Sequence, residues 1–171
     1  MTNSRVAPAF LSIILLLPLI FAGSSASADS LKDTCLGTNG ELPPIFAALK
    51  GAKSNLAAGH YAIAKKQSSA LQRTALDCIS ANYEPDVYHY AHGFGLLIQA
   101  QAQLALGDPS GKAPMERGVD EEDRLATNDN IDPGLQKLAK DAAYGGKLEL
   151  KQLEKAQKGD LFTPPPTAPP Q

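Results

Sequence analysis

The chain has 171 residues, of which 43% are hydrophobic and 20% are charged, and its formal net charge at pH 7 is −2. This length is typical of one globular domain. The slightly acidic balance argues against nucleic acid as a partner, because phosphate contacts require clustered lysine and arginine.

The first 28 residues have the pattern of an export signal. Arg5 precedes an apolar run over residues 10–22, and a small-residue cleavage pattern ends at Ala28. The apolar run is shorter than the roughly 20 residues that a membrane-spanning helix needs. We therefore expect a signal peptide, residues 1–28, whose cleavage leaves an exported protein with no stable membrane anchor. No Asn-x-Ser/Thr acceptor follows, which favours a bacterial periplasm or the cell exterior over a glycosylating secretory pathway.

Two cysteines, Cys35 and Cys78, remain after such a cleavage. An even cysteine count in an exported chain predicts a disulfide bond, because oxidising compartments keep such pairs closed. For a loop of this length, the chain-entropy estimate is about 4 kcal/mol of stabilisation. A redox-active pair is the alternative, and the lack of a C-x-x-C spacing disfavours it.

Residues 29–42 are predicted to be a polar linker that leads into a helical domain over residues 43–159. Apolar residues recur at helical spacing as far as Gly59, and the pattern restarts at His60 and continues to about residue 80. The sequence thus predicts two helices that meet at a tight corner.

A central helical pattern covers residues 85–106. Its apolar and small residues recur at steps of three and four, which indicates one buried face. Pro85 fits a first helical turn, and Gly107 provides a stop. We expect Phe94 and Leu97 to lie near the centre of the interior that the helices share.

Two glycines, Gly93 and Gly95, interrupt this central pattern. Each costs about 1 kcal/mol relative to alanine inside a helix. We interpret them as positions where a neighbouring helix approaches closely. A shallow groove for a ligand chain is the alternative.

The helical signal is weaker in the C-terminal part of the chain. A short helix is expected over about residues 115–126, where four consecutive acids suit a solvated helix start and lack the alternation of a calcium loop. A last helix begins at Asp132-Pro133, weakens at two glycines and ends at Gly159. Residues 160–171 are expected to form a disordered, proline-rich tail, with recognition by a proline-binding domain as the alternative.

Strand signals are nearly absent. No stretch alternates apolar and polar residues over β-branched positions, and good helix formers dominate the chain beyond residue 28. The predicted fold is therefore all-α, with four to five antiparallel helices.

The corner Gly59-His60-Tyr61-Ala62-Ile63-Ala64 resembles that of a tetratricopeptide repeat, in which a glycine, a polar residue and an aromatic precede a small alanine. Residues 104–108, with Ala113, resemble a second such corner, although the two glycines are farther apart than the repeat length of about 34. Over residues 43–119 the resemblance implies stacked helix pairs whose concave face binds a peptide or protein. A small helical bundle is the alternative.

Two histidines, His89 and His92, lie three residues apart and one turn after Asp86. The triplet covers a wide arc of the helix, so a zinc or copper ion would need a further ligand, for which His60 is the candidate. The structural alternative is a half-buried pair that is hydrogen-bonded to backbone carbonyls.

No motif typical of a catalytic site is present, such as a nucleophile elbow, a zinc-protease motif or a phosphate-binding glycine loop. We expect a module that is not an enzyme, needs no cofactor and engages a protein or peptide in the cell envelope; metal binding is the alternative function. The residues expected to contact the partner lie off the buried stripe: His60, His89, His92, Gln99 and Gln103. A weaker hypothesis, hydrolysis of envelope polymers, would join Glu84, Asp86 and His89.

Overall fold

The computed structural model describes residues 28–37 and 43–157, and over these residues the fold is all-α, as predicted. The predicted signal peptide apart from Ala28, and the predicted tail at residues 160–171, lie outside the described residues. No helix in the described part has both the length and the apolar content needed to cross a membrane. The helical elements in chain order are α1 (Ala28–Leu36), α2 (Pro44–Ala57), α3 (Tyr61–Ser80), α4 (Pro85–Ala105), the 3-10 turn η1 (Pro109–Gly111), α5 (Lys112–Ala126) and α6 (Pro133–Gln157).

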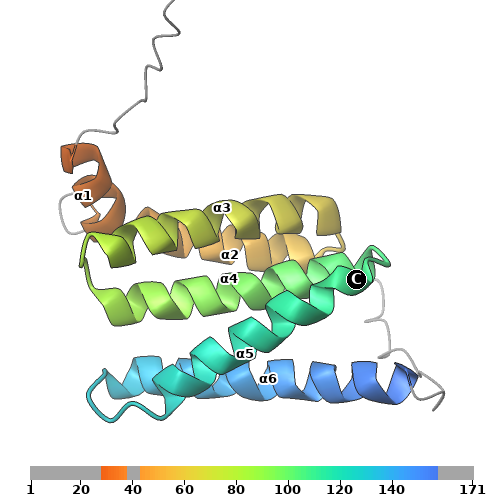
Figure 1. The fold of residues 1–171 in the computed structure, drawn as a ribbon. Coiled ribbons are helices and arrows are strands. Elements are labelled where there is room, and N and C mark those ends of the chain that lie inside the picture. Colours follow the sequence, from red (N-terminus) through yellow and green to blue (C-terminus); the bar gives the residue numbers. More distant parts are fainter. Residues whose placement is uncertain (1–27, 38–42, 158–171) are drawn as a thin grey trace, which may run out of the picture.

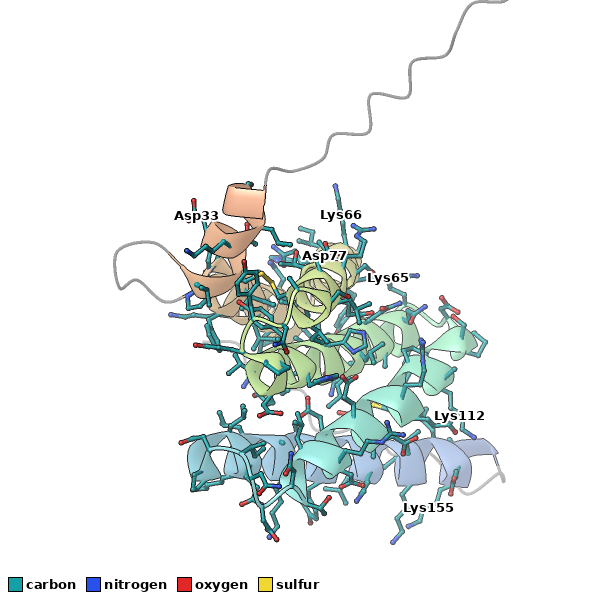
Figure 2. All side chains as sticks on the ribbon, turned by 60° about the vertical axis from the view of Figure 1, so that its left-hand side comes forward. Asp33, Lys65, Lys66, Asp77, Lys112 and Lys155 are labelled. Carbon is teal, nitrogen blue, oxygen red and sulfur yellow. A yellow bond between two sulfur atoms is a disulfide. The ribbon has the colours of Figure 1, made fainter. Side chains whose placement is uncertain are left out.

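Helix α1 occupies much of the segment that was expected to be a linker. It has nine residues, too few for a clear hydrophobic period, so the sequence pattern does not reveal it. Its Cys35 is fully buried and forms a disulfide with Cys78 at the end of α3, which confirms the predicted pairing. The bridge is visible as the yellow bond in Figure 2. With α1, the described residues hold six α-helices, where four or five were expected.

From α2 onward, each α-helix packs against the next one in the chain. Helices α2 and α3 form one pair, α4 lies beside them, and α5 crosses obliquely to reach α6 (Figure 1). Among the described residues α6 contacts α5 and α4 but not α2 or α3. Charged side chains such as Lys66 of α3 and Lys155 of α6 point away from the packed helices (Figure 2).

Helix α4 lies at the centre of the fold, because its residues belong to each of the four buried clusters in the described part of the chain. Leu97 is 5% exposed, and Phe94 is partly buried and packs against three of those clusters. The expectation that these two side chains lie in the interior is therefore confirmed. The neighbouring helices are stabilised in their positions because they bury apolar surface against α4.

The glycines of α4 allow its neighbours to approach closely, which confirms the structural interpretation of them. A Cβ atom on Gly93 would lie 2.6 Å from Oε1 of Glu122 on α5, and one on Gly95 would lie 3.2 Å from Leu71 on α3. On the facing helix, a Cβ atom on Gly118 would lie 2.9 Å from the Gly93 carbonyl oxygen. Helices α4 and α5 thus touch backbone to backbone, and this contact sets the geometry of the site described next.

Candidate binding cleft between helices α4 and α5

A cleft of about 450 Å³ opens beside the contact between α4 and α5. Residues of α4 form one wall and residues of α5 form the other. On each helix they recur at steps of three and four, because helical spacing places such residues on one face. The side chains that line the cleft are Asp86, His89, His92 and Leu96 of α4, Arg117, Asp120, Glu121, Arg124 and Leu125 of α5, and Asn128 just after α5.

One carboxylate joins the two histidines across the cleft. Nδ1 of His89 lies 2.8 Å from Oε1 of Glu121, and Nδ1 of His92 lies 2.5 Å from Oε2 of the same side chain. The Glu121 side chain is 19% exposed, and that of His92 is 17% exposed. Both carboxylate oxygens of Glu121 are therefore hydrogen-bonded to imidazole rings in a partly buried environment.

The charge state of Glu121 follows from two opposing effects. Burial raises its pKa, but the hydrogen bonds and charges of His92 and His89 outweigh burial, so the pKa lies below the usual value. Glu121 is thus a carboxylate at neutral pH and can only accept hydrogen bonds. Both Nδ1 atoms must then donate, which leaves each Nε2 of a neutral ring as an acceptor.

Four further charged side chains of the cleft have no ion-pair partner among residues 28–37 and 43–157. They are two cations and two acids: Arg117, Arg124, Asp86 and Asp120. Both arginines are exposed and lie seven residues apart on α5, about 10 Å along the helix. The cleft therefore offers free groups of both signs.

A second carboxyl group, Glu122, points into the contact between α4 and α5. It is fully buried, and neither of its oxygens has a hydrogen-bond partner of acceptable geometry. Burial, together with the charge of Glu121, raises its pKa to about 9, although the Phe94 backbone amide acts in the opposite direction. Glu122 is therefore neutral at pH 7. The pKa of the neighbouring Tyr90 is also raised by burial, to about 12.

The structure brings together only some of the residues that the sequence singled out. His89 and His92 share the cleft with Asp86, whereas His60 is exposed at the start of α3, where its Nδ1 contacts Asn55. Helices α3 and α4 run in opposite directions (Figure 1), so the start of α3, where His60 lies, is at the end of α4 that is remote from the histidine pair. Among the described residues no three histidine, cysteine, aspartate or glutamate side chains converge as metal ligands.

The two glutamines predicted to contact a partner make bonds within the fold. Gln72 of α3 donates to Oε1 of Gln99 over 2.7 Å, which ties α3 to α4. Gln103 is buried and donates to the Ser110 hydroxyl over 3.1 Å. Neither glutamine lines the cleft.

Sequence reasoning did not find Glu121, Arg117 and Arg124. Glu121 lies 32 residues from His89 and 29 from His92, and only the return of α5 along α4 brings them together. The acidic run that contains Glu121 was interpreted as solvated. The helical spacing of Arg117, Glu121 and Arg124 could have indicated that these three side chains share one face of a helix.

Comparison with family models, with curated proteins and with solved structures finds no match.

Proposed function

We propose that this chain is an exported helical binding protein whose cleft between α4 and α5 receives a segment of a protein or peptide partner in the cell envelope. The observation that carries the proposal is the cleft itself, which combines unpaired charges from both helices with imidazoles held in place by Glu121. Its volume, about 450 Å³, falls in the range of about 300–1,000 Å³ that is usual for ligand sites.

The side chains of the cleft suit the binding of a polar ligand. The groups present are hydrogen-bonding and charged, and two leucines supply apolar surface. Export to an oxidising compartment is supported by the Cys35–Cys78 bridge.

We also propose that the helix pairs form a tetratricopeptide-like stack and not a closed bundle. In support, each helix packs against its neighbour in the chain, and the first and last pairs stay apart in the described residues. The corner at Gly59 has a φ of 78°, the left-handed conformation that a glycine adopts without strain. A closed bundle would instead bring α6 against α2 or α3.

Photocrosslinking tests the binding function directly. A benzophenone amino acid is placed at Arg117 or Arg124 in the full chain, and a matched control is placed at Arg73, an exposed arginine on α3 outside the cleft. Cleft positions are expected to give a discrete crosslinked partner in cell-envelope material that the control does not give. Identical adducts at all three positions, or none at the two cleft positions, would contradict the proposal.

Metal binding by the histidine pair is the second candidate. It is favoured by Glu121, because a carboxylate that orients an imidazole through Nδ1 while Nε2 stays free is the usual support for a histidine ligand. Asp86 lines the same wall of the cleft and is the candidate for a third ligand. Calorimetric titration with zinc or copper should give one site that is lost in the His89→Ala/His92→Ala variant; no heat in the wild-type protein would exclude this candidate.

A further inference from the structure

Among the residues that line the cleft, free cations occur only on the α5 wall, which also carries the carboxylate of Asp120. On α4, Glu121 fixes both histidines as Nδ1–H tautomers, so the groups left free are the two Nε2 acceptors and the Asp86 carboxylate. On α5, the free groups that donate are the guanidinium groups of Arg117 and Arg124. Arginine binds carboxylates through paired N–H donors, whereas acceptors next to a carboxylate suit an ammonium group.

The acids disfavour a ligand that carries negative charge alone. Asp86 and Asp120 both line the cleft without a partner among the described residues, so a purely acidic segment would meet two free carboxylates. A purely basic segment would meet the two arginines in the same way. A ligand that carries an amine and a carboxylate together offers a partner to groups of both signs.

The length of the cleft fits a short peptide. Along α4 the lining runs from Asp86 to Leu96, ten residues or about 15 Å at the helical rise. An extended peptide covers about 3.3 Å per residue, so about four residues match this length. The leucines at positions 96 and 125 give its aliphatic parts an apolar surface.

We propose that the cleft binds a short zwitterionic peptide, whose ammonium group faces Asp86 and the Nε2 atoms of α4 and whose carboxylate faces the arginines of α5. Glu121 is the positioning residue, because it fixes the tautomer of both histidines. This inference rests on the proposed function and names the chemical class of its ligand.

The tautomer is tested in the full chain without any ligand. Nitrogen-15 NMR of the imidazole rings should show Nε2 without a proton in both His89 and His92 at a pH where the rings are neutral. In the Glu121→Gln variant the amide has only one acceptor oxygen, so at least one ring is expected to switch to the Nε2–H tautomer. Wild-type rings that carry the proton on Nε2 would overturn the assignment, whether or not the variant folds.

The ligand class is tested with four forms of one probe, tetra-alanine. The peptide with free termini has both charges, the N-acetylated form only the carboxylate, the C-terminal amide only the ammonium, and the doubly blocked form neither. Titration followed by the histidine ring signals should show the free peptide binding at least about fivefold more tightly than either singly blocked form. Equal affinity for all four forms, or no response to any, would overturn the proposal.

Two variants test which wall of the cleft binds each charged terminus of the peptide. Arg117→Gln/Arg124→Gln should abolish the difference in affinity between the free peptide and its amide. Asp86→Asn should reduce the difference between the free peptide and its acetylated form, because the Nε2 acceptors remain. Arg73→Gln on α3 is the matched control and should change neither ratio of affinities (free peptide to amide, or free peptide to acetylated form). If both ratios survive in the cleft variants, the assignment to these walls is wrong. A crosslinked partner at Arg117 with no peptide response would leave the binding function standing and reject only the zwitterionic ligand.

Discussion

Glu122 is an ionisable side chain placed where its charge cannot be solvated. It is fully buried, its oxygens lack hydrogen-bond partners, and its pKa is about 9 because burial disfavours the carboxylate. In the unfolded chain the same group loses its proton near the ordinary glutamate pKa of 4.5. Between these two values the native state binds more protons than the unfolded state, so stability falls as the pH rises.

The Glu122→Gln variant should remove this dependence, because the amide is similar in size and stays neutral. We expect the free energy of unfolding at pH 8 to increase by on the order of 2–4 kcal/mol, with little difference between variant and wild type below pH 4. Urea unfolding at a series of pH values measures both. Glu116→Gln, an exposed change on the same helix, is the control. A wild-type stability that does not decline between pH 5 and 9 would contradict the buried-acid interpretation.

At the residue scale, the sequence predicted part of the candidate site. The pair His89 and His92 was recognised because its members are close together in the chain and share a helix face. Their partner Glu121 was not recognised, because it lies in a run of acids that resembles any solvated helix start. Which of several neighbouring carboxylates turns inward depends on where α5 crosses α4, and helical periodicity in one segment does not contain that information.

At the element scale, the two adjacent glycines of α6 have opposite surroundings. A Cβ atom on Gly145 would meet no atom within 4 Å, whereas one on Gly146 would collide with Val119 of α5 and lie 3.0 Å from Leu97 of α4. Both lie inside one unbroken helix. Gly146 is therefore required for α6 to pack, and Gly145 is not.

Replacing each glycine with alanine should separate helix propensity from helix packing. Gly145→Ala is expected to stabilise the protein by about 0.5–1 kcal/mol, because alanine favours the helix. Gly146→Ala should destabilise it by about 1–3 kcal/mol, because the added methyl group overfills the contact with α5. Thermal unfolding measures both, and each variant is the control for the other. Changes of the same sign would show that α6 does not pack on α5 as described.

The sequence predicted the larger helices because each one buries a single face. The patterns of α2, α3 and α4 lie between clear breaks, and their predicted limits agree with the observed ones to within a few residues. Helix α1 was not predicted, because it is too short for a hydrophobic period. The last helix was expected to weaken at Gly145-Gly146, but α6 runs through both glycines because packing on α5 offsets the low helix propensity of glycine.

At the scale of the whole molecule, α1 is attached mainly at one end. The disulfide from Cys35 reaches α3, and the buried hydroxyl of Tyr88 on α4 donates a hydrogen bond to the Cys35 carbonyl oxygen. Cys35 and Cys78 belong to the same buried cluster as Tyr88, with Leu31 of α1 packed against it. Helix α1 also contacts α2, but a nine-residue helix would be marginal in water by itself.

Removing the bridge should therefore lower global stability and release α1 first. For a sequence separation of 43, the chain-entropy estimate predicts that Cys35→Ser/Cys78→Ser loses about 4 kcal/mol in the free energy of unfolding. Urea unfolding measures this loss, and limited proteolysis should cut within residues 28–37 before it cuts α3 to α6. Dithiothreitol treatment of the wild-type protein is the control and should reproduce both effects, because it opens the same bridge without a substitution. Unchanged stability together with a protected α1 would mean that burial of Leu31 and the Tyr88 hydrogen bond hold this helix without covalent help.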